Sequence, residues 1–456
     1  MPTPVAPQLV DLVEAALGAA LPVRLRAWDG SEAGAPAGPG VPVAVVRHRR
    51  ALRRLLWNPG ELGLARAFVT GELDVEGDLA DGLRRFRRLA GDRTGSPAAE
   101  KPTGLPRGTR RRAVRLALRL GAVGPRPAPP VSEARLTGRL HSRSRDRAAI
   151  AHHYDLGNDF YRLLLDSEMV YSCGYWAEAP AGGNDAGLAG AQRAKLDLIC
   201  RKLALRPGMR LLDVGCGWGA LVVHAARHYG VRATGVTLSA AQREHGLARV
   251  AELGLADRVD IRAQDYREIT DEPFDAVSSI EMGEHVGERN YPAYAATLHR
   301  VLRPGGRLLL QQMSRGAAGA DSAPGGGAFI ERYIAPDMFM RPLGATLGML
   351  ERAGHEVVDV QALREHYVWT VRPWLDTLYA RRDEAVALVG EEQYRVWLLY
   401  LAGAALSFEE NRMGVHQILA VRPEPGGRSG LPASRTALLG ADPAVSPGEP
   451  LGVRTG

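Results

Sequence analysis

Between residues 150 and 420, short apolar runs alternate with longer segments in which apolar residues recur every three or four positions. The short runs predict strands, and the longer segments predict helices that cover them. This alternation is typical of a doubly wound α/β fold with a mainly parallel sheet, in which ligands bind at the carboxyl ends of the strands. The predicted strands are residues 210–214, 232–236, 259–263, 274–280 and 307–312, and the predicted helices are residues 195–203, 220–229, 240–253 and 291–301.

The N-terminal part has a different pattern. Residues 1–95 predict a small mixed α/β domain for docking or oligomerisation, since no catalytic grouping appears in them. Residues 96–149 are rich in arginine and proline, which predicts a basic linker with one short basic helix. This linker is either a solvated connector or a strip that touches anionic lipid headgroups. The predicted elements of the small domain are a helix at 7–21, strands at 23–28 and 43–46, and a basic amphipathic helix at 47–57.

Towards its C-terminal end the main region becomes helical and aromatic. Residues at about 330–410 predict a helical cap around an apolar pocket, although individual aromatic side chains could serve ordinary helix packing. A Gly/Ala-rich stretch at 314–328 predicts a loop before this cap. Residues 422–456 are rich in Pro, Gly and Ser and predict a disordered tail, so the domain with its cap spans residues 150–421.

The chain of 456 residues has 58 Lys and Arg against 51 Asp and Glu, a net charge of +7. This charge favours an anionic partner, such as nucleic acid, a phospholipid surface or an acidic substrate. Three cysteines are too few for a disulfide framework or a zinc cluster, which favours a reducing cytoplasm. The sequence has neither a long apolar run nor a signal-type N-terminus, so we expect a cytoplasmic protein that can lie on a membrane without spanning it.

An apolar run passes into an acid and three alternate glycines at residues 211–219, LLDVGCGWG. A buried strand that turns tightly into a helix has this pattern, and the free N–H groups of such a helix can face an anionic group. The third glycine comes one residue too early for the dinucleotide pattern G-x-G-x-x-G. The loop therefore favours a nucleoside cofactor with an amino-acid tail, while a turn without a ligand remains an alternative.

Five further motifs accompany the glycine loop. They are HYDLGNDFY at 153–161, YSCGYW at 171–176, TLS at 237–239 followed by Gln242, QDYR at 264–267 and EMGEHVG at 281–287. With these motifs, residues 150–420 resemble the cyclopropane-fatty-acyl-phospholipid synthase family, which includes the mycolic acid cyclopropane synthases. The resemblance implies an S-adenosyl-L-methionine-dependent methyltransferase. It also implies unsaturated phospholipid as the substrate, a peripheral position at the inner face of the membrane, and lipid docking by the N-terminal domain. We further expect a homodimer.

The same resemblance assigns ten residues to the cofactor. Tyr266 takes the place of the usual tryptophan, but the stacking face is preserved. By the part of the cofactor they would contact, the residues are Tyr171 and Ser172 for the amino-acid end, Asp213, Gly215, Gly217 and Trp218 for the floor, Thr237 and Gln242 for the ribose, and Asp265 and Tyr266 for the adenine.

The chemistry that the resemblance implies is demanding. Methyl transfer to an isolated alkene leaves a cation on the acyl chain, which must be shielded from water and stabilised by electron-rich groups such as aromatic faces. The resemblance also implies a bound bicarbonate that removes a proton from the new methyl group and closes a cyclopropane ring. The catalytic residues that would hold this bicarbonate are Cys173, Glu284, Gln311, Met313 and Tyr367.

Two positions depart from the family pattern. Gln311 stands where the family has a histidine, and Gly283 replaces a usual aromatic residue. Glutamine can bind an anion but cannot titrate near neutrality, so the base would be held differently or be absent. The cation would then migrate by hydride shift and give a methylene- or methyl-branched (10-methyl type) chain, which we favour over a ring. A separate flavin-dependent reductase would complete a saturated branch.

Other interpretations of the sequence compete with this one. They are a methyltransferase for a small soluble molecule, a nucleic-acid methyltransferase and a non-catalytic lipid-binding protein. The basic residues gather in the linker, away from the cofactor loops, so we expect no nucleic-acid partner. We expect no metal either, since His152 and His153 are adjacent and lack a third ligand. Glu281 is either a second polar group in the pocket or a solvent-facing neighbour, and His285 is interpreted as structural.

Overall fold

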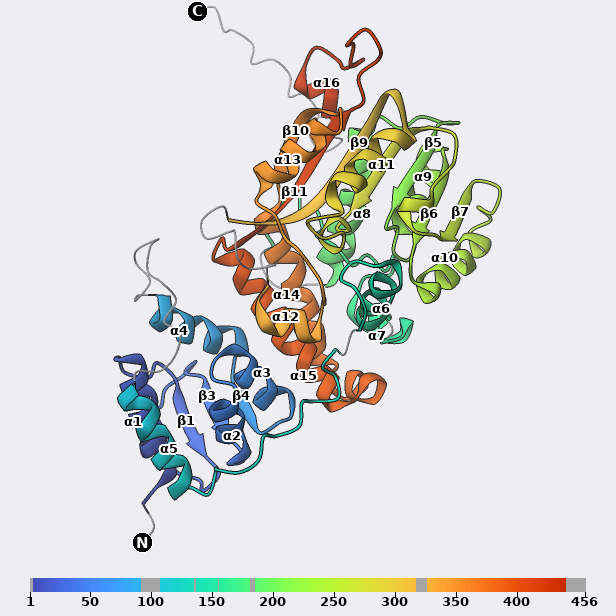
Figure 1. Ribbon diagram of the computed structural model, residues 1–456. Coiled ribbons are helices and arrows are strands. Elements are labelled where there is room, and N and C mark those ends of the chain that lie inside the picture. Colours follow the sequence, from blue (N-terminus) through green and yellow to red (C-terminus); the bar gives the residue numbers. More distant parts are fainter. Residues whose placement is uncertain are drawn as a thin grey trace, which may run out of the picture.

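The computed structural model describes residues 3–91, 107–134, 137–154, 156–180, 185–316 and 326–439. A seven-stranded sheet forms its main body, in the order β10-β11-β9-β8-β5-β6-β7 (Figure 1). Strand β11 runs antiparallel to both of its neighbours, and the five strands from β9 to β7 are parallel. The strands are β5 (Arg210–Val214), β6 (Arg232–Thr237), β7 (Val259–Ala263), β8 (Phe274–Ile280), β9 (Leu302–Arg315), β10 (Glu356–Ala362) and β11 (Met413–Val421).

Helices cover both faces of this sheet, which confirms the predicted doubly wound α/β class. Successive residues of a strand point to opposite faces, so Leu211 joins the hydrophobic core on one face and Leu212 the core on the other. The first core contains side chains of α8 (Asp185–Lys202), α9 (Ala220–Tyr229) and α10 (Ala240–Glu252). The second contains side chains of α11 (Tyr291–Val301) and α13 (Leu343–Arg352).

Part of the expected cap belongs to the sheet layers instead. Within residues 330–410, α13 packs against α11 and β10 extends the sheet at its edge. The sequence EVVDVQA of β10 alternates only weakly and is half-exposed, because an edge strand buries less of its surface. This pattern therefore does not predict a strand, and the sequence does not predict β11, which lies between β9 and β10, either.

Four helices build the cap at the carboxyl ends of the strands, between the sheet and the N-terminal domain (Figure 1). Helix α15 contains a kink at Gly390, whose φ of 80° interrupts the helical backbone. The buried side chains of the four cap helices belong to a third hydrophobic core, which is rich in Tyr and Trp. The helices are α7 (Asn158–Leu164), α12 (Gly327–Tyr333), α14 (Arg364–Ala380) and α15 (Arg382–Glu409).

The N-terminal domain has its own four-stranded sheet, in the order β2-β1-β3-β4. Helix α5 lies in the stretch expected as a linker, yet it packs against α1 and α2 because Ala113 and Ala117 give it a buried apolar stripe. The strands are β1 (Arg24–Ala27), β2 (Glu32–Gly34), β3 (Val43–Val46) and β4 (Leu73–Glu76). The helices are α1 (Val5–Leu17), α2 (Arg50–Trp57), α3 (Glu61–Val69), α4 (Leu79–Gly91) and α5 (Arg107–Arg119), and α6 (Arg143–Tyr154) follows the connection to the main body.

Two stretches expected without regular structure are partly ordered. Residues 422–439 leave β11 and end in the short helix α16 (Arg435–Leu439), where Arg435 pairs with the buried Asp359 at 2.5 Å. The expected tail is therefore wrong for this segment, and residues 440–456 lie outside the described residues. In the expected loop at 314–328, Ser314 and Arg315 extend β9, and residues 317–325 are not described. Among the described residues, no helix is long and apolar enough to cross a membrane.

Candidate active site

A cavity opens at the carboxyl ends of β5, β6 and β8, where the fold predicts a ligand. All ten residues predicted to contact the cofactor line this cavity, although they come from four separate motifs. They are Tyr171, Ser172, Asp213, Gly215, Gly217, Trp218, Thr237, Gln242, Asp265 and Tyr266.

The glycine loop forms one wall of the cavity. Gly215, Gly217 and Gly219 have φ angles of 83°, 54° and 89°, in the left-handed region that side chains disfavour. A Cβ atom at Gly215 would lie 2.7 Å from Cγ of Met282, whereas a Cβ at Gly217 would meet no atom within 4 Å. The loop is therefore tightly packed behind Gly215 and open at Gly217, which leaves its backbone accessible to a ligand.

Polar side chains of the cavity hold one another in place. Asp213 accepts a hydrogen bond from Oγ of Ser278 at 2.7 Å, and burial raises the pKa of its carboxyl to about 6. Thr237 donates to Oε1 of Gln242 at 2.8 Å. Burial opposes the charge of Asp265, but hydrogen bonds from Arg267 keep the pKa of this carboxyl below its usual value.

Two further residues position the cavity wall, and the sequence did not single them out. Lys195 is 1% exposed and donates to Oγ of Ser172 at 2.9 Å, and burial lowers the pKa of its ammonium group. Asn158 accepts a hydrogen bond from the indole N–H of Trp218 at 2.8 Å. The signal for Asn158 was its place in the HYDLGNDFY motif, whereas Lys195 had no signal beyond its place in a helix.

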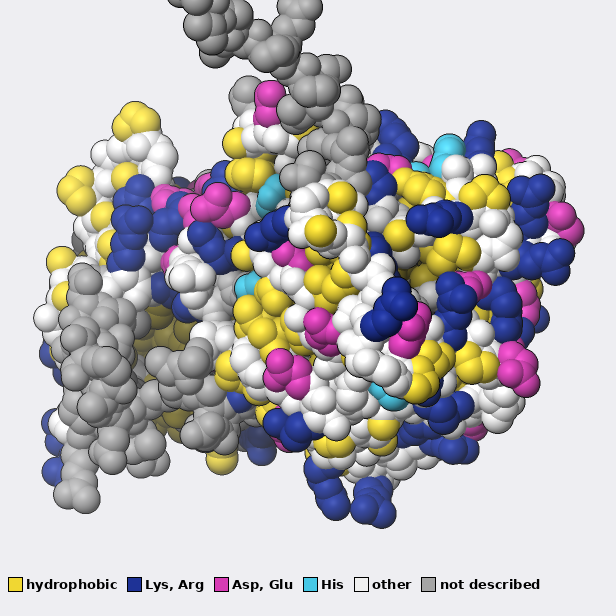
Figure 2. Space-filling view, turned by 90° about the horizontal axis from the view of Figure 1, so that it is seen from above, with side chains coloured by type: hydrophobic (Ala, Val, Ile, Leu, Met, Phe, Trp, Pro, Cys, Tyr) yellow, Lys and Arg dark blue, Asp and Glu magenta, His cyan; other side chains and the backbone are white. Residues whose placement is uncertain are grey.

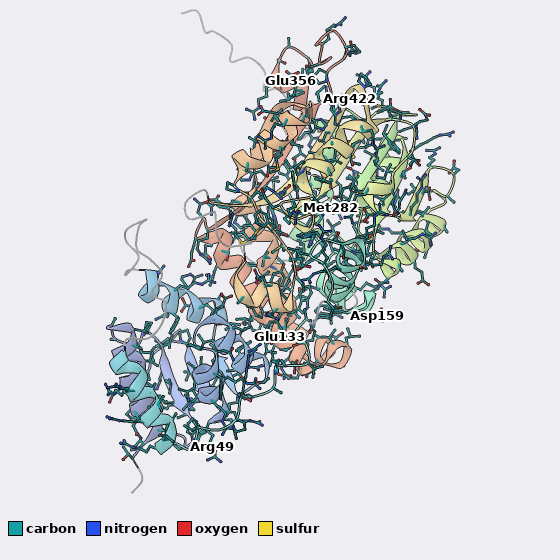
Figure 3. The ribbon with its side chains drawn as sticks, viewed as in Figure 1. Arg49, Glu133, Asp159, Met282, Glu356 and Arg422 are labelled. Atoms are coloured by element: carbon teal, nitrogen blue, oxygen red, sulfur yellow. The ribbon has the colours of Figure 1, made fainter. Side chains whose placement is uncertain are left out.

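A second polar cluster lies beside the cavity and is centred on Glu281. One carboxylate oxygen of Glu281 accepts from the backbone N–H of Cys173 at 2.9 Å and from Nε2 of Gln311 at 2.8 Å. The other accepts from the hydroxyl of Tyr367 at 2.6 Å. Glu281 also lines the cofactor cavity, and its neighbour Met282 lies where the sheet meets the cap (Figure 3). Three of the five predicted catalytic residues therefore meet at Glu281.

The orientation of Gln311 follows from a chain of buried hydrogen bonds. Lys202 can only donate, so the 2.8 Å contact of its Nζ fixes Oε1 of Gln417 towards it. Nε2 of Gln417 then donates to Oε1 of Gln311 at 3.0 Å. The amide N–H₂ of Gln311 must therefore face Glu281, and the direction does not depend on which amide atom is assigned as nitrogen.

The other two predicted catalytic residues form a separate pair. Glu284 accepts a hydrogen bond from the backbone N–H of Met313 at 2.5 Å. Glu284 is fully buried, and burial together with the nearby charge of Glu281 raises the pKa of its carboxyl to about 8. Cys173, Gln311 and Tyr367 have hydrogen bonds to Glu281 rather than to Glu284, and one anion site shared by these residues with Glu284 stays a prediction.

The missing aromatic residue at position 283 has a packing explanation. A Cβ atom at Gly283 would lie 2.4 Å from Oε1 of Gln312 and 3.3 Å from the ring of Tyr291. The hydroxyl of Tyr291 donates to the same Gln312 oxygen at 2.6 Å. Gln312 and Tyr291 therefore fill the space that a larger side chain at position 283 would need.

Aromatic rings connect the glycine loop to the interior of the cap. The ring centroids of Trp218 and Tyr161 are 4.8 Å apart at one end of this series, and those of Tyr367 and Phe408 are 4.5 Å apart at the other. The hydroxyl of Tyr171 donates to that of Tyr400 at 3.1 Å. In order, the rings are Trp218, Tyr161, Tyr171, Trp374, Tyr367 and Phe408.

The described residues contain no group of three His, Cys, Asp or Glu side chains placed to hold a metal ion. The side chains of His152 and His153, which the sequence raised as a metal pair, lie outside the described part.

Comparisons with known proteins identify the family of this chain. Residues 141–418 match the family described as mycolic acid cyclopropane synthetase. The chain is 39% identical over 420 residues to the probable fatty acid methyltransferase Rv3720 of Mycobacterium tuberculosis, covering 90% of this chain and 93% of that protein. It is 32% identical over 409 residues to the tuberculostearic acid methyltransferase UfaA1 of the same species, with 89% of each chain covered. The crystal structure of mycolic acid cyclopropane synthase CmaA1 with SAH and CTAB has a TM-score of 0.56 and 34% identity, covering 60% of this chain and 97% of that one.

The fold and these likenesses define an S-adenosylmethionine-dependent methyltransferase. Within that class, the chain belongs to the mycolic acid cyclopropane synthase family, and it modifies lipid chains. The resemblance seen in the sequence and the predicted cofactor are therefore confirmed.

The cavity fits this cofactor. The open space at Gly217 admits a ligand against the backbone, and the aromatic faces of Tyr266 and Trp218 both border the cavity. When bound, S-adenosylmethionine supplies a methyl group on a positively charged sulfur, which an electron pair of the substrate can attack. Bicarbonate, which the resemblance also implied, does not fit in the same way, because the donors of Cys173, Gln311 and Tyr367 are bonded to Glu281.

Proposed function

We propose that this methyltransferase adds a one-carbon unit to the double bond of an unsaturated acyl chain in membrane phospholipid, giving a methylene- or methyl-branched chain. The observation that carries the proposal is the position of the cofactor cavity, which borders both the Glu281 cluster and the aromatic interior of the cap. An apolar chain in the cap would meet the methyl group where water is excluded.

The ten cavity residues have distinct proposed roles at the cofactor. Tyr171 and Ser172 hold the amino-acid end, and Lys195 adds a cation behind Ser172. Thr237 and Gln242 contact the ribose, and Asp265 and Tyr266 flank the adenine. The floor consists of Asp213, Gly215, Gly217 and Trp218, and the hydrogen bond from Trp218 to Asn158 fixes the indole ring against this floor.

The cap supplies what the acyl cation requires. The alkene pair forms the new C–C bond, and the positive charge left on the chain is attracted by the electron-rich faces of Tyr171, Trp374 and Tyr367. The half-buried carboxylate of Glu281 adds electron-rich oxygens nearby. A hydride shift followed by loss of a proton then gives a methylene branch and leaves the chain neutral.

We favour branching over ring closure because the relatives named as fatty acid methyltransferases match more of this chain than the cyclopropane synthase structure does. The tuberculostearic acid methyltransferase and the probable fatty acid methyltransferase match about nine-tenths of this chain, whereas the cyclopropane synthase structure covers 60% of it. A saturated methyl branch needs two further electrons and two protons, so we propose that a flavin-dependent reductase acts afterwards.

The N-terminal domain is proposed to dock on the cytoplasmic leaflet. Helices α2 and α5 contact one another and expose Trp57 and Leu118, at 53% and 61%. The same helices carry the exposed cations of Arg50 and Arg112, which pair with Glu72 and Asp11. Cations beside apolar anchors suit an anionic lipid surface. Figure 3 places Arg49, which precedes α2, at the end of the molecule farthest from β10. On the face drawn in Figure 2, by contrast, basic and acidic side chains are intermixed. We also propose a homodimer for this enzyme, formed through the same domain.

The test is an assay of the purified protein with vesicles of oleoyl phosphatidylglycerol and S-adenosylmethionine, followed by mass spectrometry of the acyl chains before and after hydrogenation. We expect chains heavier by one methylene unit that take up hydrogen, as an unsaturated branch does. A chain that gains the same mass but resists hydrogenation would be a ring and would contradict branching. Vesicles that gain no mass would contradict the phospholipid substrate.

A further inference from the structure

Glu281 has an unusual backbone conformation for its residue type. It follows β8 directly and has a φ of 51°, in the left-handed region where a non-glycine residue costs about 1 kcal/mol or more. Its own N–H is bonded to the carbonyl of Gln311 at 2.7 Å, which ties this conformation to β9. Such strain is retained chiefly at functional sites, and here it directs the carboxylate into the cluster beside the cofactor cavity.

The groups around Glu281 suit an ionised carboxylate. Cys173 presents a backbone N–H, Gln311 an amide N–H₂ whose direction is fixed by Lys202, and Tyr367 a hydroxyl. A carboxylate has about four acceptor positions, and these donors use three of them. Among the described residues, the oxygen that faces Tyr367 accepts the hydrogen bond of that hydroxyl alone, so it can still accept a proton.

These contacts leave a bound bicarbonate without its ligands. Cys173, Gln311 and Tyr367 are three of the five residues that the family resemblance assigned to bicarbonate, and each directs its donor to Glu281 instead. A carboxylate and bicarbonate share the same O–C–O acceptor geometry. The side chain of Glu281 therefore offers these donors the acceptor oxygens that the resemblance assigned to an external anion.

We propose that Glu281 is the catalytic base of this enzyme and takes the place of bicarbonate. The inference rests on the proposed function, since it needs a cation on a methylated acyl chain. In the step, a C–H bond of the new methyl group, next to the cationic carbon left by the hydride shift, breaks, and its electron pair forms the carbon–carbon double bond of the methylene branch. The proton goes to the free position on the carboxylate of Glu281 and leaves to solvent after the product departs.

Two neighbouring features support this assignment. Burial raises the pKa of Glu281 in spite of its hydrogen bonds, which makes it a stronger base than a surface carboxylate. Its neighbour Glu284 is buried with a pKa raised to about 8, so near neutrality Glu284 holds a proton while Glu281 has the donors that stabilise a charge. A carboxyl that already holds a proton cannot accept another, so Glu284 is not the proton acceptor.

The first experiment measures methyl transfer by wild-type enzyme to oleoyl phosphatidylglycerol vesicles in buffer freed of carbon dioxide, with and without added bicarbonate. We expect the two rates to agree within about twofold. A rate that rises more than tenfold with bicarbonate would overturn the proposal.

The second experiment compares three variants. Glu281→Gln keeps the shape but not the basicity and is expected to lose at least a hundredfold in turnover, within the range for removal of a general base. Glu281→Gly is expected to be equally slow, and because the empty site keeps its three donors, added bicarbonate or formate should raise its rate at least tenfold. The exposed Glu252→Gln is the matched control and should retain wild-type turnover.

Binding of S-adenosylhomocysteine, measured by calorimetry, separates a lost base from a lost fold. All three variants should bind it within about threefold of wild type. Glu281→Gln with more than a tenth of wild-type turnover, or Glu281→Gly that binds normally without rescue by either anion, would contradict the proposal. If wild type itself transfers no methyl group to the lipid, the proposed function fails instead.

Discussion

At the scale of single residues, two glutamates three positions apart have different environments. Glu281 accepts hydrogen bonds from Cys173, Gln311 and Tyr367, whereas Glu284 accepts only the backbone N–H of Met313 among the bonds described above. Two buried carboxyls that lie close together cannot both ionise cheaply. The one with more donors is therefore the charged member of the pair.

This division predicts how stability depends on pH. The carboxyl of Glu284 has a pKa of about 8 in the folded protein against an ordinary value of 4.5, so between these values the folded state holds a proton that the unfolded state releases. The contribution of the Glu284 carboxyl to the free energy of unfolding is fully present below pH 4.5 and is lost as the pH rises towards 8. Glu284→Gln should remove this loss, on the order of 3 kcal/mol between pH 5 and pH 8.

The measurement is the free energy of unfolding by urea at several pH values. Charges that face Glu284 are those of Glu281 and Arg341, and they remain in the variant. The surface change Glu252→Gln provides the control and should leave the wild-type pH dependence intact. An unchanged slope in Glu284→Gln would show that Glu284 does not hold a proton at neutral pH.

At the scale of elements, α2 and α5 combine cations with exposed apolar side chains. The guanidinium groups of Arg50 and Arg112 lie on side chains that are 58% and 57% exposed. Each cation near an anionic membrane is worth about 1 kcal/mol. Arg50→Glu/Arg112→Glu should therefore weaken binding to phosphatidylglycerol vesicles at least tenfold in low salt.

Co-sedimentation with such vesicles over a series of salt concentrations measures this effect. The matched control is Arg206→Glu/Arg258→Glu, which reverses two exposed charges on the sheet domain and should bind like wild type. Binding by wild type should weaken as salt rises, because screening reduces the attraction. Equal weakening by both double variants would assign the binding to net charge rather than to α2 and α5.

At the scale of the whole molecule, a buried ion pair and hydrogen bonds join the N-terminal domain, the connection after α5 and the cap. Arg66 of α3 pairs with Glu133 at 2.6 Å, and both side chains are 6% exposed. Tyr333 of α12 donates to the same carboxylate at 3.4 Å, and Figure 3 shows Glu133 at the junction of the two bodies. Nearby, Arg395 of α15 donates to the carbonyl of Phe68 at 2.6 Å.

Breaking this pair should destabilise the molecule strongly. Arg66→Met leaves the charge of Glu133 buried without its partner, which typically costs about 3–5 kcal/mol, whereas the double change Arg66→Met/Glu133→Gln should recover much of that loss. Unfolding by urea measures both variants. For comparison, Arg382→Met removes one partner of the exposed pair with Glu391 and should cost less than about 1 kcal/mol. A cost below 1 kcal/mol for Arg66→Met would mean that the pair does not hold the two bodies together.

The sequence by itself determined the sheet domain and the cofactor side of the site. Apolar runs that are buried on both faces, such as Leu211–Leu212 in β5, can be recognised without knowledge of their neighbours, and the glycine loop depends on local backbone geometry. Local motifs also sufficed to find ten residues that line one cavity. The sequence did not predict the half-exposed strand β10 or the packing of α5 against the N-terminal domain, because the burial of both depends on elements far away in the chain.

Only the tertiary structure decided which acid faces the reaction. Glu281 and Glu284 stand in one motif, and nothing local separates them, because their hydrogen-bond donors come from β9, α14 and the segment of Cys173. The direction of the Gln311 amide depends on Lys202 at the end of α8 and on Gln417 in β11. Local sequence fixes backbone shape, but the charge state of a buried carboxyl depends on every donor that surrounds it, and the fold alone brings those donors together.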